Sequence, residues 1–365
     1  MNFLKDKTVL VTGHTGFKGS WLSSWLISIG ARVVGISIDV PSEPSNYKAS
    51  NLERHIEDHR IDICDFDKIS KVVSKCQPDY VFHLAAQALV LASYEFPFET
   101  IKTNALGSVS ILEAVRKLNK QVNVIMITSD KVYDNVEWTW GYRENDKLGG
   151  KDPYSASKGM AELGINTYIH SFFNKPESNI RIAIGRAGNV IGGGDWALDR
   201  IVPDCMKAWS SGIDVSIRNP HATRPWQHVL EPLSGYISLA RFLEKNNDIN
   251  GEAYNFGPNA NQSHSVSELI GEMGRHWENI RWNNNSHEEK SFHEASLLKL
   301  NCDKALHHID WKPSLHFDET VKMTVEWYKT YYQNKNQSMF QYTIKQIEEY
   351  HKIAKMRKID WALHD

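Results

Sequence analysis

The sequence predicts an α/β protein in which a doubly wound parallel sheet is followed by a smaller, mixed α/β C-terminal lobe. Short apolar strand patterns alternate with helical patterns as far as about residue 185, and a glycine-rich turn follows the first strand. Beyond that point glycine, proline and tryptophan interrupt shorter elements. Such alternation is typical of a parallel sheet that is covered by helices on both faces. We expect a sheet domain over residues 1–185, a lobe over 186–330 and a helical tail over 331–365.

The predicted elements follow one another in a regular order. Strands are indicated by short apolar or β-branched runs, and helices by apolar residues at a spacing of three and four. We expect strands at residues 8–11, 33–38, 60–63, 80–84, 122–127 and 180–184, and helices at 21–29, 67–76, 103–118 and 155–173. In the tail, Ile344, Ile347, Tyr350 and Ala354 recur at helical spacing, which predicts an amphipathic helix packed on the body or on a neighbouring subunit.

Composition argues against several classes of protein. The 365 residues include 42 Lys and Arg against 44 Asp and Glu, and a net charge of −2 does not suit a protein that coats nucleic acid. Apolar stretches fall short of the ~20 residues of a membrane span, and the first residues lack the pattern of a signal peptide. Cys64, Cys76, Cys205 and Cys302 lack the paired spacing of a zinc site or a disulfide framework. We expect a cytoplasmic protein that binds no metal, nucleic acid or membrane.

The glycine-rich turn points to a cofactor site of the Rossmann type. It follows a predicted strand and opens a predicted helix, where glycines allow a tight turn and free N–H groups bind phosphate. An isolated pattern of this kind also occurs in ordinary loops. Here Asp39 lies 20 residues after Gly19 at the end of the second strand, where a carboxylate bonds the adenosine ribose and favours NAD over NADP. Arg32 lies at the far end of that strand. The residues expected to hold the cofactor here are Gly13, Thr15, Gly16, Phe17, Lys18, Gly19 and Asp39.

Tyr154 and Lys158 are four residues apart and therefore share one face of a predicted helix. A cation near the phenol lowers its pKa and makes it a usable base for a hydroxyl proton. Tyr331 and Lys335 repeat the spacing in the polar tail, where we expect a surface pair. Tyr154 differs from Tyr331 in its context. It lies in the sheet domain, 25 residues after Ser129, which ends a predicted strand.

Five motifs together resemble the extended short-chain dehydrogenase/reductase family and, within it, the nucleotide-sugar 4,6-dehydratases. They are TGHTGFKG at 12–19, HLAAQ at 83–87, Asn104 in KTNALGS, TSDKVY at 128–133 and YSASK at 154–158. The likeness runs from about Thr8 to Tyr328. The dTDP-glucose enzymes look like Thr-Asp-Glu where this chain has Ser129-Asp130-Lys131, so Lys131 replaces their glutamate. GHTGFKGSWL at 13–22 and RPWQHVLEPL at 224–233 look like the branch that acts on CDP-glucose.

The resemblance implies a mechanism for these residues. Tyr154, helped by Lys158 and Ser129, would remove the C4 hydroxyl proton of the sugar as hydride passes to NAD. Lys131 would then remove the C5 proton and Asp130 would protonate the departing C6 hydroxyl, after which the hydride returns to C6. Such a lysine must be neutral, which burial and nearby cations favour. From spacing alone, Asp130 and Lys131 also suit an exposed turn with an ordinary salt bridge.

Further contacts are expected from the resemblance and from residue chemistry. For the cofactor they are Asp62, Ile63, Leu84, Ala85, Ala86 and Asn104, together with Tyr154 and Lys158; Asp62 also suits a solvated turn, and His83 a structural role. A substrate diphosphate needs cations, and the candidates are Arg200, Arg218, Arg224 and His228. The neutral side chains of Gln87, Asn189 and Trp226 are further candidate substrate contacts. Residues 192–194 suit either a flexible loop over the nucleotide or a simple turn. Trp138, Trp140, Trp196 and Trp226 are expected to face the substrate, and the remaining eight tryptophans to pack in the core.

The family also implies partners and leaves alternatives. It implies a homodimer formed through helices 103–118 and 155–173, with CDP-glucose or a similar nucleotide sugar as substrate. The product would serve deoxysugar biosynthesis for a surface polysaccharide such as lipopolysaccharide O-antigen. The alternatives are a C4 epimerase or a dehydratase of a dTDP-, GDP- or UDP-hexose, and a non-catalytic NAD-binding sensor. Ser129, Asp130, Tyr154 and Lys158 together argue against the sensor, which needs none of them.

Overall fold

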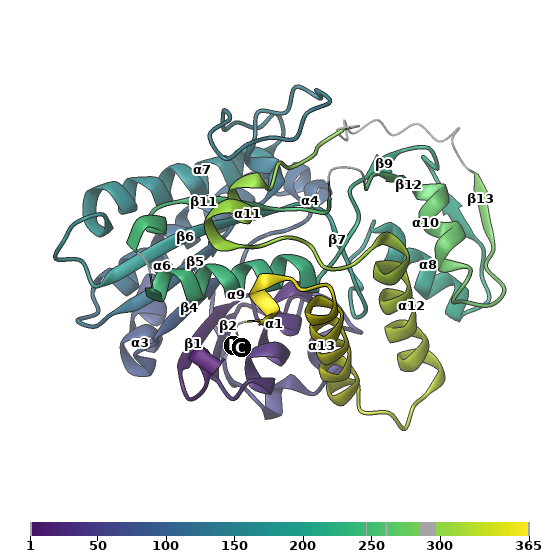
Figure 1. Cartoon of the computed structure of the whole chain (residues 1–365), viewed down its shortest axis with the longest axis horizontal. Helices are drawn as coiled ribbons and strands as arrows, with labels where there is room; N and C mark the ends of the chain where they lie inside the picture. Colours follow the sequence, from purple (N-terminus) through teal and green to yellow (C-terminus); the bar gives the residue numbers. More distant parts are fainter. Residues whose placement is uncertain (1, 246, 260–261, 285–296, 364–365) are drawn as a thin grey trace.

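A parallel sheet of seven strands forms the centre of the part of the chain that the computed structural model describes, residues 2–245, 247–259, 262–284 and 297–363 (Figure 1). Its strand order is β11-β6-β5-β4-β1-β2-β3, and each neighbouring pair is parallel. The strands are β1 (Thr8–Thr12), β2 (Arg32–Ser37), β3 (Glu57–Arg60), β4 (Tyr80–His83), β5 (Val122–Ile127), β6 (Ile180–Ala187) and β11 (Ala253–Phe256). The predicted fold class is confirmed.

Helices cover both faces of this sheet. On β1, Val9 and Val11 join one buried cluster and Leu10 the other, so successive side chains separate the two faces. The first cluster contains the helices α1 (Phe17–Ser28) and α9 (Leu230–Lys245), and the second contains α3 (Phe66–Cys76), α6 (Gly107–Arg116) and α7 (Pro153–Tyr168). The ends of the parallel strands are thereby held between two apolar layers.

Two predicted boundaries of the sheet domain are wrong. The third strand was expected at residues 60–63 but spans 57–60. Its EDHR sequence is polar and shows no apolar strand pattern, and pairing with β2 places it at the edge of the sheet. The sheet also does not end near residue 185, since β11 pairs with β6 and α9 packs on β5 and β6. Residues 230–256 therefore return to the sheet domain from within the predicted lobe.

The lobe consists of short elements beside the sheet, at the right in Figure 1. Its strands are β7 (Val190–Ile191), β8 (Val215–Ile217), β9 (Thr223–Arg224), β10 (Gln227–His228), β12 (His264–Ser265) and β13 (Trp282–Asn284), which pair as β10–β7, β12–β9 and β13–β8. Its helices are α8 (Ile201–Ser210), α10 (Val266–Met273) and α12 (Phe317–Gln333). Since α12 crosses residue 330, the lobe and the predicted tail are continuous.

The tail packs on the body of the molecule. It contains α13 (Met339–Met356) and α14 (Asp360–Leu363), and residues 364 and 365 lie outside the described part. The ring of Trp25 on α1 meets Tyr350 and Trp361 edge-on at 5.9 and 6.4 Å. The remaining helices are α2 (Asn46–Ala49), α4 (Val90–Glu95), α5 (Pro97–Ile101) and α11 (Asp303–Ile309), the π-helical turns η3 (Lys102–Leu106) and η5 (Ile169–Phe173), and the 3₁₀ turns η1 (Asn2–Leu4), η2 (Leu52–Arg54), η4 (Asp130–Val132) and η6 (Asn247–Ile249).

The tryptophans divide differently from the prediction. Trp21 and Trp25 are buried in the core as expected. Trp196 was expected to face the substrate, but it is 2% exposed and packs edge-on against Trp327 and Tyr328. Trp282 was expected in the core and is 37% exposed on an edge strand.

Candidate active site

The glycine-rich turn connects β1 to α1 and fits a dinucleotide. Gly13 has φ +75°, and a Cβ there would lie 2.7 Å from the backbone nitrogen of Ala85. A Cβ on Gly19 would lie 2.0 Å from the carbonyl oxygen of Gly13, so only glycine lets the helix begin this close to the strand. Gly16 is the N-cap of α1 and offers no side chain to its first N–H groups. These donors are therefore suited to a phosphate.

His83 at the end of β4 belongs to the support of this turn. Its Nδ1 lies 2.8 Å from the hydroxyl of Thr12 and its Nε2 lies 3.0 Å from that of Ser108. Burial lowers the pKa of His83 to about 3, and the charge of Lys158 lowers it further. The ring is thus a neutral hydrogen-bonding bridge inside the domain, as expected for a structural residue.

Asn104 connects the segment after β4 to helix α7. Its Oδ1 accepts from the backbone nitrogen of Gln87 at 2.8 Å, and its Nδ2 donates to the hydroxyl of Ser157 at 2.8 Å. Gln87 in turn donates from Nε2 to Thr100 at 2.9 Å. The side chains of Asn104 and Gln87 therefore fix the backbone of residues 84–87 beside α7.

The predicted catalytic residues meet where β5 ends. Ser129 caps the short turn η4, donating to Asp130 Oδ1 at 2.9 Å and accepting from the backbone nitrogen of Lys131 at 3.2 Å. Tyr154 and Lys158 lie on the first turns of α7 and are 9% and 7% exposed. Ser129 also hydrogen-bonds with the Tyr154 phenol. Hydroxyl, carboxyl and phenol thus lie together in a largely dry site.

Burial shifts the titration of the Tyr154–Lys158 pair. The sequence predicted a lowered phenol pKa, but burial raises the pKa of Tyr154 to about 12, against the hydrogen bond with Ser129. Burial lowers the pKa of the Lys158 ammonium to about 8, with Lys18 lowering it further and Glu162 opposing. Lys158 can therefore exchange its proton close to neutral pH.

In the same site, the charges of Asp130 and Lys18 affect each other's pKa. Burial raises the pKa of the Asp130 carboxyl, against the charge of Lys131, the hydrogen bond from Ser129 and the charge of Lys18. Burial lowers the pKa of Lys18 to about 8, against the charge of Asp130 and assisted by that of Arg200. A carboxyl that is easier to protonate is suited to a general acid.

A cavity of about 220 Å³ opens beside Asp130. Its lining comes from segments far apart in the chain: Asp130, Thr139, Trp140, Gly141, Gly188, Pro225, Gln227, Gly257, Pro258, Asn259, Gln262, Leu298, Lys299, Leu300 and Asn301. Trp140 is 72% exposed and Trp138 38%, with the two rings edge-on at 6.2 Å. A Cβ on Gly188 would lie 2.9 Å from Asp130 Oδ2, so this residue must be small. Apart from Asp130 and Trp140, none of these residues was predicted to face the substrate.

The arginines predicted to bind substrate are dispersed. Arg200 pairs with Asp195 at 2.7 Å, and its charge affects the pKa values of both Lys18 and Tyr154, so it lies near the site. Arg218 pairs with Asp199 at 3.7 Å, and its side chain is 65% exposed. Arg224 donates from Nη1 to the carbonyl of Thr223 at 2.9 Å, while Asn189 is exposed just before β7.

His228 and Trp226 were expected to contact substrate, and in the structure both side chains are buried. His228 is fully buried edge-on to Trp21 at 5.8 Å, its Nδ1 accepts from the backbone of Leu230, and burial lowers its pKa to about 3. Trp226 is 7% exposed and donates its Nε1 to the carbonyl of His264. The cavity is lined instead by the intervening Gln227, since alternate residues of a strand face opposite sides.

The glycines at 192–194 form a clamped turn and not a free loop. Trp21 donates from Nε1 to the carbonyl oxygen of Gly193 at 2.8 Å. The backbone nitrogen of Asn46 donates to the carbonyl oxygen of Gly194 at 3.2 Å. A Cβ on Gly193 would lie 2.1 Å from Trp327. This turn therefore ties the lobe to α1 and α2.

A buried ion pair that the sequence reasoning missed lies behind the catalytic residues. Glu162 accepts from Arg186 through both carboxylate oxygens, with Nε to Oε1 at 2.8 Å, and from the Thr128 hydroxyl at 2.6 Å. Arg186 also donates to the phenol of Tyr133 at 2.7 Å. Glu162 follows Lys158 by one helical turn, which was the available signal. The pair joins α7 and β6 to the segment that carries Ser129.

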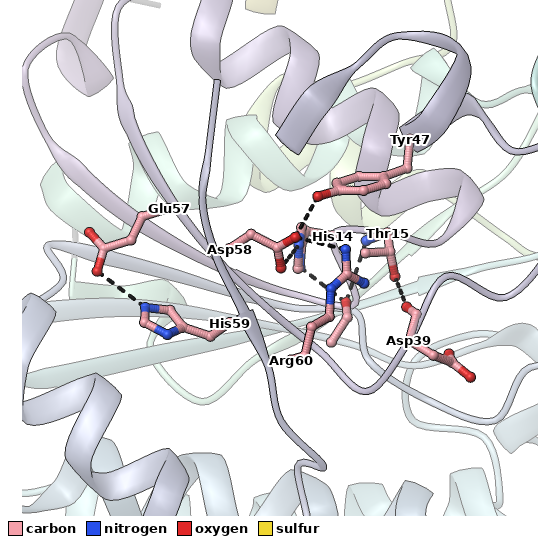
Figure 2. A network of polar contacts seen from close by, with 9 residues as sticks. His14, Thr15, Asp39, Tyr47, Glu57, Asp58, His59 and Arg60 are labelled. Carbon is pink, nitrogen blue, oxygen red and sulfur yellow. Dashed lines mark hydrogen bonds and ion pairs between the residues drawn. The ribbon is translucent and has the colours of Figure 1, made fainter. Parts of the chain in front are cut away.

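The adenosine end of the expected cofactor site lies beside β2 and β3 (Figure 2). Asp39 is exposed, and its backbone carbonyl accepts from the Thr15 hydroxyl at 2.6 Å. Asp62 accepts from the backbone nitrogen of Cys64 at 2.9 Å, as a turn residue does. Ile63 is buried against Gly107, where a Cβ would lie 2.5 Å from its side chain, so the Ile63 side chain is part of the core.

No group of three or more His, Cys, Asp or Glu side chains could hold a metal ion in the part of the chain that the structure describes. Among the helices of the described ranges, none is both long and apolar enough to traverse a lipid bilayer.

Known proteins with similar sequences include nucleotide-sugar dehydratases and epimerases. Residues 10–324 match the family model described as GDP-mannose 4,6 dehydratase. The chain is 46% identical over 334 residues to a CDP-glucose 4,6-dehydratase of Salmonella typhimurium strain LT2, covering 90% of this chain and 92% of that protein. It is 25% identical to a CDP-paratose 2-epimerase of Salmonella typhi, covering 87% of this chain and 98% of that protein.

Solved structures share the fold at lower identity. A UDP-glucose 4-epimerase of Thermotoga maritima with UDP-glucose has a TM-score of 0.74 at 23% identity, covering 88% of this chain and 99% of that chain. A UDP-glucuronic acid 4-epimerase of Bacillus cereus, in complex with UDP-glucuronic acid and NAD, gives the same TM-score, identity and coverage.

Proposed function

Because this chain belongs to the GDP-mannose 4,6-dehydratase family, we propose that it is a nucleotide-sugar 4,6-dehydratase whose substrate is CDP-D-glucose. The observation that carries the choice of substrate is the 46% identity, over 90% of the chain, to a CDP-glucose 4,6-dehydratase. The product is CDP-4-keto-6-deoxy-D-glucose. The reaction has no net redox change, so NAD stays bound through the cycle.

NAD, when bound, supplies the acceptor and donor of the hydride. The glycine-rich turn, with Gly13, Gly16 and Gly19, would hold its pyrophosphate, and Asp39 its adenosine ribose. Tyr154 accepts the proton of the C4 hydroxyl. Lys158, whose pKa burial has lowered to about 8, stabilises the phenolate as a nearby cation.

Elimination of water is assigned to Asp130 and Lys131. The new 4-ketone acidifies the C5 proton, and Lys131 removes it. Asp130 protonates the C6 hydroxyl as it leaves, which its raised pKa supports. Asp130 also lines the cavity of about 220 Å³, so the sugar is expected to lie there with Trp140 at the rim.

Substrate diphosphate binding is assigned to the predicted cations that lie nearest this site. Arg200 is the first candidate, because its charge affects both Lys18 and Tyr154. Gln87, Asn189 and Arg224 remain proposed contacts. Arg218 is the weakest of the set, since its guanidinium lies at the surface opposite Asp199.

The test compares Lys131→Ala with a matched lysine variant. Purified protein is incubated with CDP-, dTDP-, GDP- and UDP-hexoses, and the 4-keto product is measured by its absorbance in alkali. Wild type is expected to convert CDP-glucose, and Lys131→Ala to lose product formation while retaining its NAD. Lys335→Ala should turn over as wild type does, because Lys335 is exposed; the surface pair predicted with Tyr331 is not found, since the Tyr331 ring packs against Trp196 and Trp327. Turnover by Lys131→Ala at the wild-type rate would contradict the assignment, and a new sugar without the chromophore would indicate an epimerase.

The homodimer is also a proposal. Apolar side chains are exposed on elements that contact one another, α5, η3 and α7: Phe98 (73%), Leu106 (60%), Leu163 (61%) and Met160 (46%). Large exposed apolar side chains gathered on neighbouring elements suit an interaction site. The dimer is expected in sedimentation equilibrium, and Leu163→Glu should shift it to the monomer. A wild-type protein that sediments as a monomer would overturn this proposal.

Location and destination follow from the same assignment. All four cysteines are free thiols, which suits a reducing compartment, and we place the enzyme in the cytoplasm. A 4-keto-6-deoxy sugar activated by a nucleotide suits deoxysugar biosynthesis for a surface polysaccharide such as O-antigen. The place in deoxysugar biosynthesis depends on the proposed activity.

A further inference from the structure

Asp58, at the adenosine end of the site, is the centre of a polar network (Figure 2). Its Oδ1 lies 3.0 Å from Nε2 of His14, a residue of the glycine-rich turn. Its Oδ2 accepts from the phenol of Tyr47 at 2.5 Å and from Nη2 of Arg60 at 2.7 Å. The carboxylate thus joins three elements, the turn after β1, the helix α2 and the strand β3.

Arg60 lies close to the predicted ribose contact. It is the last residue of β3 and pairs in register with Ser37, two residues before Asp39. Its guanidinium lies 5.1 Å from the centre of the Tyr47 ring. The Arg60 side chain is 36% exposed, against 18% for Asp58, so the cation is on the outer side of the network.

Arg32 differs from Arg60 in its position along the sheet. It is the first residue of β2 and pairs with Glu57 at 2.6 Å, at the opposite end of the strands from Asp39. Both arginines are therefore matched by carboxylates of β3, but only Arg60 lies at the carboxyl end, where a parallel sheet binds its ligands. A cation at this end bears on the choice between NAD and NADP.

The carboxylate of Asp58 is held in place from the interior. The ring of His14 lies over Gly35, where a Cβ would meet it at 2.5 Å, and its Nδ1 lies 3.0 Å from the Ser37 hydroxyl. Burial opposes ionisation of Asp58, but hydrogen bonds from His14 and Tyr47 and the charges of His14 and Arg60 hold its pKa well below the ordinary value. Asp58 is therefore ionised at neutral pH, and its hydrogen bonds with His14 and Tyr47 orient the carboxylate beside Arg60.

A guanidinium is the side chain best matched to a phosphate, since it donates two parallel hydrogen bonds. Resting on the proposed use of NAD, we propose that Asp58 is a specificity-determining residue: by holding Arg60 in an ion pair, it withholds from the adenosine site a cation that would otherwise accept a 2′-phosphate. Asp39 repels the 2′-phosphate directly. Asp58 holds Arg60, the cation that could otherwise offset this repulsion. Cofactor choice then depends on two carboxylates, one at the ribose and one on β3.

The test measures cofactor exchange on the purified holoenzyme and needs no sugar substrate. Protein carrying NAD is incubated with increasing NADP, and the released NAD is quantified by chromatography. Asp58→Asn is expected to improve the competition by NADP at least about tenfold, as a charge-assisted hydrogen bond to phosphate would give. Arg60→Ala alone should change the exchange by less than about twofold, because Asp58 already occupies that arginine. The double variant should return to the wild-type ratio.

A second background keeps the test decisive if Asp58→Asn does not fold. Asp39→Ser alters an exposed residue and removes the direct repulsion, so NADP competition should rise. Adding Arg60→Ala should leave that rise unchanged, since Asp58 still holds the arginine, and a rise that Arg60→Ala abolishes would overturn the inference. An Asp58→Asn variant that folds without any gain, or a gain that survives in the double variant, overturns the inference. Wild-type protein that carries and binds no NAD would instead refute the proposed function.

Discussion

Glu162 and Glu231 are both almost fully buried, at 0% and 1% exposure, but their charges are balanced in different ways. Glu162, behind the catalytic residues, faces the guanidinium of Arg186. Glu231, where the tail meets the body, accepts from backbone N–H groups and from the phenol of Tyr350 at 2.8 Å. A cation balances the first charge and dipoles balance the second.

The difference shows in the pKa values. Burial raises the pKa of Glu231 to about 7, although hydrogen bonds from Leu315, Ser314 and Tyr350 and the charge of Arg357 oppose the rise. Arg186 remains a cation, because the charge of Glu162 outweighs its burial and raises its pKa. Behind the active site, the guanidinium of Arg186 therefore stays charged beside Glu162, while the carboxyl of Glu231 at the tail titrates near neutrality.

Arg186→Met should have the largest effect, because it leaves Glu162 buried without a partner. Breaking a buried pair on one side costs about 3–5 kcal/mol of the free energy of unfolding, measured by urea denaturation. Arg181→Met on the same strand is the control; Arg181 is partly exposed and donates to the Leu243 carbonyl, so a loss of about 1 kcal/mol or less is expected. Adding Glu162→Gln to Arg186→Met should restore part of the stability. Equal losses in the two arginine variants would contradict the ionic description.

Glu231 should make the stability of the fold depend on pH. Its pKa in the folded protein, about 7, lies above the ordinary 4.5, so its contribution is fully present below about pH 4.5 and is lost as pH rises through 7. The shift corresponds to about 3 kcal/mol between these limits. Glu231→Gln should remove that slope in urea denaturation from pH 4.5 to 8, and Glu252→Gln, at a carboxylate 48% exposed, should retain it. A slope that persists in Glu231→Gln would assign it to another group.

The sheet could be predicted because its signals are local. Apolar runs of four to eight residues between helical patterns indicated strands β1, β2, β4, β5 and β6. β3 was displaced because its polar sequence acquires its place from pairing with β2, and β11 was missed because polar Asn255 interrupts its apolar run and only pairing with β6 places it. Pairing and burial, which depend on the rest of the fold, decide such elements.

The residues of the candidate site were likewise predictable only where their signal is local. Tyr154 and Lys158 were predictable because helix periodicity puts them on one face. His228 was not, because β10 has two residues and a sequence gives no way to tell which of them faces the core. The cavity beside Asp130 is assembled from segments near residues 139, 188, 226, 258 and 300, so only the fold brings its lining together.

Tyr350→Phe should sharpen the description of the tail joint with an intermediate effect. The phenol donates to Glu231 Oε2 at 2.8 Å and lies 3.0 Å from the Ser234 hydroxyl. Losing a hydrogen bond to a charged group costs about 1.5–3 kcal/mol, and the cost should be larger at pH 8, where Glu231 is ionised, than at pH 5. Urea denaturation at both values measures it. A loss of the same size at both would mean that the phenol does not stabilise the charge.

Thr128→Val should have the smallest effect, because it removes one donor from a carboxylate that Arg186 still satisfies. The Thr128 hydroxyl donates to Glu162 Oε1 at 2.6 Å, and Arg186 Nε donates to the same oxygen at 2.8 Å. The expected loss is about 1 kcal/mol in urea denaturation, independent of pH between 5 and 8, and Thr128→Ser should restore it. Thr128 directly precedes Ser129, so kcat should fall while the bound NAD is unchanged. A loss that grows with pH would mean that Glu162, like Glu231, depends on neutral donors for its charge.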